Sequence, residues 1–172
     1  MQRLSGLIFL TAISLVSAAA LDPDEGARSL SFYHTHTAVE LSVTYYSNGE
    51  YDDEALAELN RFLKDFRTGD AMEMDRAVFD IIFDIQKEAG STGVYQVISG
   101  YRSPATNEML RSNSGGVAKN SQHLLGKAID VRLTDLDTVK LRDVAIALQR
   151  GGVGYYRESD FVHVDTGRVR RW

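Results

Sequence analysis

The chain has 172 residues, of which 44% are hydrophobic and 25% charged, as is typical of a single globular domain. Its net charge of −5 at pH 7 argues against binding nucleic acid through a basic face. Because the chain has no cysteine, disulfides and thiolate metal sites are excluded, and any metal must be held by His, Asp or Glu.

Residues 1–20 have the pattern of a secretory signal peptide. Arg3 is followed by a short apolar run and an Ala-x-Ala arrangement, which predicts cleavage before Leu21. The apolar run is shorter than the about 20 residues of a membrane span. We expect a Sec-exported protein of the periplasm or cell envelope, without stable membrane insertion after cleavage, and one domain over residues 21–172. An uncleaved N-terminal anchor is the alternative.

The first half of the predicted domain contains a β segment and two helices. Residues 28–52 are rich in β-branched and aromatic side chains and contain an Asn-Gly turn signal, which predicts a strand pair or an irregular N-terminal β arm. Asp52 and Asp75 are typical N-caps of two amphipathic helices. The first of these helices is expected to end at residues 68–70.

The second half alternates strands and helices. We expect strands at 94–99, 128–133 and 161–165 and helices at 104–113 and 138–149. Short connections and the alternation of apolar and polar residues favour an α+β domain, in which an antiparallel sheet has helices packed on one side.

Three polar side chains in this half have the composition of a metal site. Asp130 and His163 lie on the strand faces opposite the apolar rows, so neighbouring strands about 4.8 Å apart would bring both to one point. His123 lies in the loop before the first of these strands, where Gly126 allows a tight turn. Two imidazoles and one carboxylate leave a fourth position open, as in catalytic zinc sites. Spacing alone leaves open the interpretation of each histidine as an ordinary surface or core residue.

Several sequence strings add a family resemblance. Residues 121–130 resemble the S-x-H-x-x-G-x-A-x-D motif of the zinc D-Ala-D-Ala peptidases and their hedgehog-domain relatives, the LAS metallopeptidases, and residues 163–165 are similar to their second motif. The strings SGYRSPATNEMLR, SQHLLGKAIDVRL, GGVGYY and FVHVDTGRVRRW resemble the murein endopeptidase branch of this family. The resemblance covers nearly all of the mature chain.

The resemblance implies a zinc site and a role for one arginine. It makes His123, Asp130 and His163 the ligands of one Zn²⁺ per chain. It also suggests that Arg102 binds the scissile carbonyl or a substrate carboxylate. A fixed guanidinium can stabilise the negative charge that develops on the carbonyl oxygen during amide hydrolysis.

The general base is expected among the carboxylates near the last histidine. Related carboxypeptidases have a glutamate three residues before this ligand, and Asp160 occupies that position here. We therefore predict that Asp160 deprotonates water and later protonates the leaving amine. Glu158 and Asp165 are the alternatives. Asp165 and Ser121 are otherwise expected to contact substrate or to orient a ligand imidazole.

The other two histidines have no role in the resemblance. His34 and His36 would share one face of a strand, a spacing that suits a metal pair, but we interpret them as surface residues of the β arm. Tyr155 and Tyr156 either line a substrate groove or pack in the core or at its rim.

The sequence therefore predicts a monomeric zinc peptidase whose partner is the peptide stem of peptidoglycan. The resemblance implies endopeptidase cleavage of D-Ala–meso-diaminopimelate or diaminopimelate–diaminopimelate cross-links by a metal-activated water. A D,D- or L,D-carboxypeptidase or a dipeptidase on the same scaffold is the first alternative. A non-catalytic cell-wall-binding module that retains zinc is the second.

Overall fold

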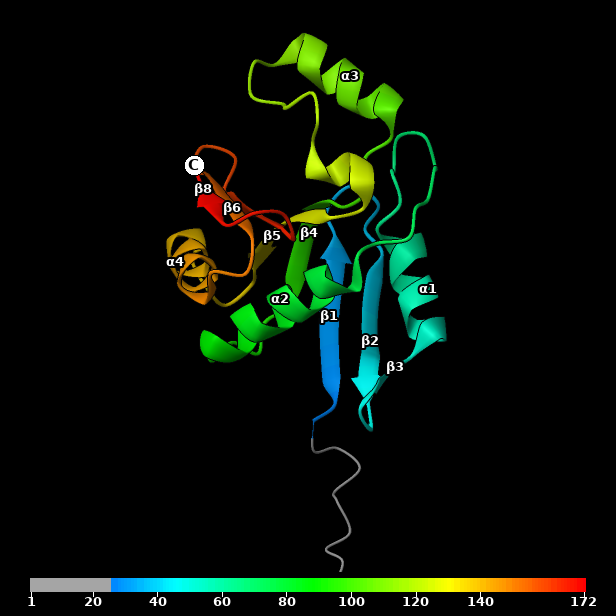
Figure 1. Cartoon of the computed structure of the whole chain (residues 1–172), viewed down its shortest axis with the longest axis vertical. Coiled ribbons are helices and arrows are strands. Elements are labelled where there is room, and N and C mark those ends of the chain that lie inside the picture. Colours follow the sequence, from blue (N-terminus) through cyan, green and yellow to red (C-terminus); the bar gives the residue numbers. More distant parts are fainter. Residues whose placement is uncertain (1–25) are drawn as a thin grey trace, which may run out of the picture.

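The computed structural model describes residues 26–172, so the predicted signal peptide lies outside the described residues. Between residues 26 and 172, no helix is long and apolar enough to cross a membrane. This part of the chain forms one sheet of eight strands, four α-helices and a short 3₁₀ helix, η1 (Figure 1).

The described chain begins and ends with three consecutive strands, and the helices lie between these two runs together with β4 and β5. In chain order the elements are β1 (Arg28–His34), β2 (Glu40–Ser47), β3 (Glu50–Tyr51), α1 (Asp53–Phe62), α2 (Arg76–Glu88), β4 (Tyr95–Ser99), α3 (Pro104–Asn113), η1 (Gln122–Leu125), β5 (Ala128–Leu133), α4 (Thr138–Leu148), β6 (Gly152–Tyr156), β7 (Phe161–Asp165) and β8 (Arg170–Arg171). The five elements expected in the second half are present within one residue of their predicted bounds.

The sheet is mixed and mostly antiparallel, with the strand order β3-β2-β1-β4-β5-β7-β6-β8. The β1–β4 and β6–β8 pairs are parallel, and the other five pairs are antiparallel. The α+β class is thus confirmed. The predicted β segment supplies three strands, and its first strand pairs with β4 inside the sheet.

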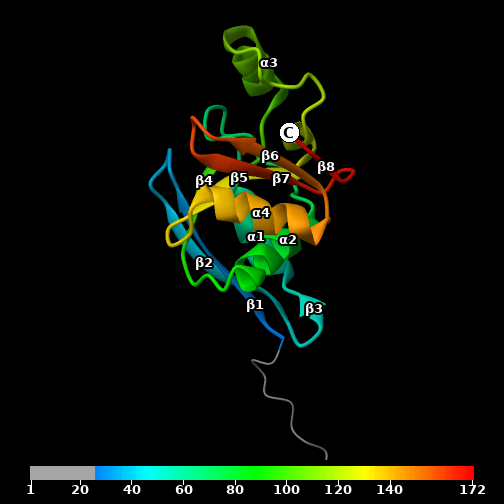
Figure 2. The same cartoon turned by 90° about the vertical axis from the view of Figure 1, so that its left-hand side faces the viewer.

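Three helices cover one face of the sheet, as Figure 2 shows for α1, α2 and α4. Side chains such as Val97, Val131 and Val162 point to this face and are fully buried in the core. The fourth helix, α3, lies on the other side of β4–β7 (Figure 2). The expectation that helices pack on one side therefore holds for all helices except α3.

Side-chain caps fix where helices begin. Asp52 and Asp75 accept hydrogen bonds from backbone N–H groups in the first turns of α1 and α2, as predicted. However, α1 ends before the predicted residues 68–70. The carbonyl of Leu63 accepts a hydrogen bond from the N–H of Tyr101 at 2.8 Å instead of continuing the helix.

The sequence-based prediction does not contain β6, β8 or η1. Glycine is a poor strand former, yet β6 contains Gly152 and Gly154. A Cβ at Gly154 would lie 2.6 Å from the Trp172 ring, so glycine lets the C-terminal segment lie directly over β6. With two residues, β8 is too short to show an alternating pattern.

Candidate metal centre

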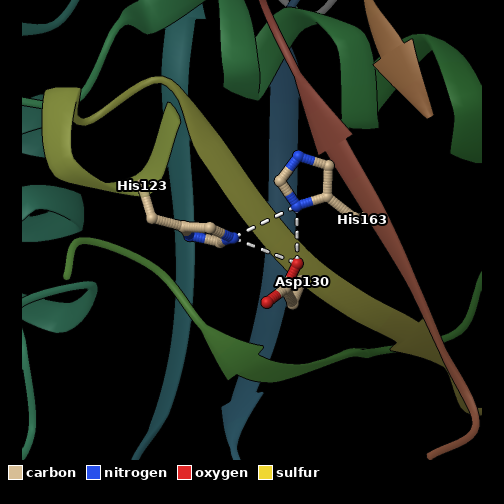
Figure 3. Close-up of side chains that lie close together, drawn as sticks. All are labelled: His123, Asp130 and His163. Atoms are coloured by element: carbon tan, nitrogen blue, oxygen red, sulfur yellow. Dashed lines mark hydrogen bonds and ion pairs between the residues drawn. The ribbon is translucent and has the colours of Figure 1, made fainter. Parts of the chain in front are cut away.

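Neighbouring strands bring two of the predicted ligands together. β5 and β7 pair in a register that places Asp130 directly opposite His163. Both side chains point away from the helix-covered face, because the alternate residues Val131 and Val162 are buried in the core. His123 reaches the same point from η1, as Figure 3 shows.

The 3₁₀ helix that carries His123 is fixed at both ends. Ser121 is its N-cap, and the Ser121 hydroxyl accepts a hydrogen bond from the His123 N–H at 3.3 Å. Gly126 follows the helix with a φ of 65°, and a Cβ there would lie 2.6 Å from the Glu73 carbonyl oxygen. The tight turn at Gly126 is therefore present as expected, and no larger residue fits in its place.

Three ligand-type atoms converge at this point (Figure 3). His123 Nε2 lies 3.2 Å from Asp130 Oδ1 and 3.1 Å from His163 Nδ1, and the latter two atoms are 2.8 Å apart. Tetrahedral ligands at typical zinc–nitrogen distances would be about 3.3 Å apart. In the part of the chain that the structure describes, these three residues have ligand atoms within 4.8 Å of one another and are all buried. The donor set and its spacing fit a divalent metal ion.

Hydrogen bonds from outside the cluster aim the free ring nitrogens at its centre. His123 Nδ1 donates to the backbone carbonyl of Gly100 at 2.7 Å, which leaves Nε2 with the lone pair. His163 Nε2 donates to Asp165 Oδ2 at 2.9 Å, so Nδ1 is the nitrogen that faces the cluster and would bind a metal ion once its proton is released. Partners of this kind fix the tautomer and increase the basicity of metal-binding imidazoles.

Asp165 is fully buried and surrounded by donors. Arg170 donates to both of its carboxylate oxygens, at 2.9 and 2.6 Å, and the backbone N–H groups of Gly152 and Gly167 donate to Oδ1. Burial alone would raise the pKa of Asp165, but its hydrogen bonds with His163 and Arg170 hold it well below its usual range. A carboxylate held in this way is suited to orienting His163 and poorly placed to accept a proton from water.

The cluster also binds protons. Burial dominates at His123 and lowers its pKa, which favours the neutral imidazole that metals require. At His163, burial is outweighed by hydrogen bonds with Asp130 and Asp165, and the pKa is raised to about 9. A proton on His163 Nδ1 competes with a metal ion for the same atom, so metal binding is expected to weaken as the pH falls.

Arg102 lies beside the cluster with an unpaired donor. It is 9% exposed, and its Nη2 lies 3.6 Å from Asp130 Oδ2 and 3.4 Å from the Ser99 hydroxyl. Its Nε is buried and has no hydrogen-bond partner among residues 26–172. An unpaired buried donor is costly, so this guanidinium is suited to receive an oxygen atom of a ligand.

The cluster opens onto a cavity of about 600 Å³, which Arg102 and all three ligand residues line. One part of the lining is aromatic. The rings of Tyr156 and Phe161 stack at 4.6 Å, and Trp172 Nε1 donates to the Tyr156 hydroxyl at 3.1 Å. The Trp172 indole also lies 5.3 Å from the His163 ring. The rest of the lining consists of Ser114, Gly116, Val117, Ala118, Asn120, Ser121, Gln122, Glu158, Ser159 and Arg170.

Asp160, the predicted general base, is not among the residues that line this cavity. Its Oδ1 accepts a hydrogen bond from the Thr138 hydroxyl at 2.7 Å, and its Oδ2 accepts one from Arg132 at 3.3 Å. Glu158, the alternative, does line the cavity. Asp160 would have to leave Thr138 and Arg132 to act on a bound substrate, so Glu158 is a strong competitor for the role.

His34 and His36 take no part in the cluster. His34 is 1% exposed and packs edge-on against Phe66, so the prediction that it is a surface residue is wrong. It lies on the same side of β1 as the buried Phe32, and this two-residue period was the signal in the sequence. His36 is exposed, as predicted, and stacks on Phe66.

Among the residues that line the cavity, Arg170 and Trp172 had no predicted role in the sequence. Arg170 binds Asp165 and lies 4.9 Å from the Trp172 ring. Both belong to a string that carries the family resemblance, but nothing in their spacing indicated a role. Of the two tyrosines, Tyr156 lines the cavity, whereas Tyr155 packs against the core.

Comparison with known proteins supports a peptidase site. A family model described as "Peptidoglycan L,D-endopeptidase MepK" matches residues 22–172. The peptidoglycan L,D-endopeptidase MepK of Escherichia coli K12 is 37% identical over 169 residues, which cover 98% of this chain and 93% of the relative. The probable peptidoglycan L,D-endopeptidase MepK of Haemophilus influenzae is 38% identical over 170 residues, with coverage of 98% and 91%. No solved structure matches the chain.

Proposed function

The chain belongs to the M15 peptidase family of peptidoglycan L,D-endopeptidase MepK, and we propose that it hydrolyses L,D cross-links between the peptide stems of peptidoglycan. One observation carries the proposal: His123, Asp130 and His163 form a buried cluster that opens onto a cavity large enough for part of a peptide. Arg102, whose buried Nε has no hydrogen-bond partner within the part of the chain that the structure describes, lies at the same place.

We assign Zn²⁺ to the cluster. Catalytic zinc sites typically have three protein ligands, such as two imidazoles and one carboxylate, and leave the fourth coordination position to water or substrate. When bound, zinc supplies a Lewis acid for the scissile carbonyl and lowers the pKa of a water molecule. The chain itself holds the ligand geometry. The Gly100 carbonyl and Asp165 each fix one imidazole, so little reorganisation is needed when substrate binds.

Arg102 binds the oxygen on which negative charge develops, or a carboxylate of the stem. Its buried Nε has no partner within residues 26–172, and its Nη2 contacts are long. A hydrogen bond from this guanidinium to a substrate oxygen therefore replaces no strong contact within the protein. Removing one such donor in other hydrolases costs about 100- to 1000-fold in kcat.

Hydrolysis also needs a group that takes a proton from water and delivers one to the leaving amine. We propose a carboxylate of the segment 158–160 for this role. Glu158 lines the cavity, and Asp160 holds the sequence position three residues before His163. Asp165 is excluded from the role, because Arg170 and His163 occupy its oxygens.

The names of the relatives specify an L,D bond. A diaminopimelate–diaminopimelate cross-link joins the carbonyl of an L-centre to the amine of a D-centre, whereas a D-Ala–diaminopimelate cross-link joins two D-centres. We therefore assign the diaminopimelate–diaminopimelate bond. The aromatic lining of Tyr156, Phe161 and Trp172 offers an apolar surface to the aliphatic chain of diaminopimelate.

The place of action follows from the substrate. A hydrolase of peptidoglycan works in the cell envelope, in agreement with the export signal predicted in residues 1–20. We propose that the protein acts there as a monomer.

The proposal is tested with zinc-loaded protein and two sets of purified muropeptide dimers. One set is joined by diaminopimelate–diaminopimelate bonds and the other by D-Ala–diaminopimelate bonds, and the products are separated by chromatography. Monomers are expected from the first set alone. Monomers from the second set would reassign the bond, loss of one terminal residue would indicate a carboxypeptidase, and bound zinc without product would indicate a wall-binding module.

A further inference from the structure

The segment that carries Arg102 rests on the turn after α1. The backbone N–H of Tyr101 donates to the Leu63 carbonyl at 2.8 Å. Gly100 lies so close to this turn that an added Cβ would be 2.6 Å from the same carbonyl oxygen. The place of Arg102 is therefore coupled to a turn far earlier in the chain.

A buried carboxylate, Asp65, is at the centre of this contact. It is 1% exposed; its Oδ2 accepts a hydrogen bond from the backbone N–H of Ser103 at 2.9 Å, and its Oδ1 accepts one from that of Arg67 at 3.0 Å. Burial alone would raise the pKa of Asp65, but hydrogen bonds with Thr106 and Ser103 lower it to about 2. The carboxylate is charged at neutral pH, and hydrogen bonds to charged acceptors are roughly twice as strong as neutral ones.

The side chain of Arg102, in contrast, makes few contacts that fix it. Its Nη2 lies 3.6 Å from Asp130 and 3.4 Å from Ser99, which are long distances for hydrogen bonds. Its backbone is held on both sides, because the Arg102 N–H donates to the His123 carbonyl and the next N–H, that of Ser103, donates to Asp65. The backbone therefore places the guanidinium.

We propose that Asp65 is a positioning residue, which acts through Ser103 to fix the Arg102 guanidinium beside the metal cluster; this inference rests on the proposed function. Asparagine at this position keeps the size but has one acceptor oxygen, so one of the two backbone donors loses its partner. The backbone at Arg102 and Ser103 is then held less firmly. A displacement of about 1 Å at a substrate-binding group can cost about 100-fold in rate.

The first test is a double-mutant cycle on cleavage of diaminopimelate–diaminopimelate dimers. Asp65→Asn is expected to lower kcat/KM by about tenfold or more, with zinc content per chain unchanged. In an Arg102→Ala background the same substitution is expected to change kcat/KM by less than about twofold, because the group it positions is gone. Equal losses in both backgrounds would indicate a general structural role and overturn the inference.

Asp80→Asn is the matched control for lost stability. Asp80 is 7% exposed and binds Arg28 and the Tyr51 hydroxyl, away from the cavity-lining residues. This variant is expected to lower Tm but to change kcat/KM by less than about twofold. If Asp65→Asn does not fold, Thr106→Val is used in its place, because it removes one hydrogen-bonding group from the Asp65 carboxylate and keeps the charge. This variant is expected to lower kcat/KM by less than Asp65→Asn.

The second test does not depend on activity and separates this inference from the proposed function. Crystal structures of the wild type and of Asp65→Asn, or of Thr106→Val, are compared at the Arg102 side chain. Displacement or disorder of the guanidinium, with His123, Asp130 and His163 in place, supports the inference. An unmoved guanidinium overturns it, whereas wild-type protein that cleaves neither set of dimers counts against the proposed function alone.

Discussion

At the scale of single residues, His123 and His163 are suited to bind a metal ion because other groups orient their rings. The sequence motifs predicted His123, Asp130 and His163 as the metal ligands. They also indicated that Asp165 could orient the imidazole of one of these histidines. They did not indicate that a backbone carbonyl, that of Gly100, orients His123. Every residue has a backbone carbonyl, so no residue type in the sequence marks this contact, and it joins residues 23 positions apart. The burial of His34, which was predicted to be exposed, follows from its two-residue period with Phe32, because this period places both side chains on one face of β1.

Asp165→Asn tests this orientation. It is expected to weaken zinc binding by about 10- to 100-fold, because the amide is a poorer acceptor for His163 and leaves Arg170 without its ion pair. Competition with a zinc chelator measures the affinity. Asp143→Asn, at an exposed position of α4, is the control and is expected to match the wild type. Unchanged affinity in Asp165→Asn would contradict the role assigned to Asp165.

Glu158→Gln and Asp160→Asn separate the two candidate proton acceptors. We expect Glu158→Gln to lower kcat by about 100-fold or more. Asp160→Asn is expected to change kcat little, because Asp160 is engaged with Thr138 and Arg132 outside the cavity lining. Both variants should retain zinc. The opposite result in the kcat measurements would restore the assignment based on the position of Asp160 in the sequence.

At the scale of elements, the strands that build the cavity differ in how well the sequence predicts them. β5 and β7 have clear alternation because one of their faces lies against the helices. β6 has glycines where alternation would place side chains, since Trp172 and Arg170 occupy that space. This arrangement depends on a contact between distant segments, and no local pattern predicts it.

Gly154→Ala is the corresponding prediction for β6. The added Cβ would meet the Trp172 ring at 2.6 Å, so we expect the indole to move away from His163 and the free energy of unfolding to fall by about 1–3 kcal/mol. Thermal or urea unfolding and the quenching of Trp172 fluorescence measure the two effects. Gly115→Ala, whose Cβ would meet nothing within 4 Å, should alter neither. Equal behaviour of the two variants would contradict the close packing of Trp172 on β6.

At the scale of the whole molecule, the sheet separates the hydrophobic core on one face from the candidate metal cluster on the other. Helices α1, α2 and α4 cover one face, and α3 lies on the other (Figure 2). Asp130 and His163 point away from the helix-covered face, because Val131 and Val162 are buried on it, and the cavity that these two residues line is therefore on the side of α3. The α+β class was predictable because alternation and helix caps are local. The strand order was not, because the parallel pairing of β1 with β4 joins segments separated by α1 and α2.

The acid stability of the whole domain depends on buried carboxylates such as Asp65. Its pKa is lowered from 3.8 to about 2, so it contributes to stability above about pH 4, and this contribution is lost as the pH falls towards 2. The shift corresponds to on the order of 2 kcal/mol. Urea unfolding at several pH values should therefore show that Asp65→Asn is destabilised most at pH 5–7 and least near pH 2. A constant difference at all pH values would contradict this linkage.

We infer that His123, Asp130 and His163 hold the metal ion on which hydrolysis depends. The most direct test removes metal with a chelator, adds zinc back stepwise, and follows the cleavage of diaminopimelate–diaminopimelate dimers in the wild type and in His163→Ala. We predict that wild-type activity is lost on chelation and returns at one zinc per chain, and that the variant neither retains zinc nor cleaves. Full cleavage by chelated wild type, or by His163→Ala, would contradict the assignment of these three residues as metal ligands.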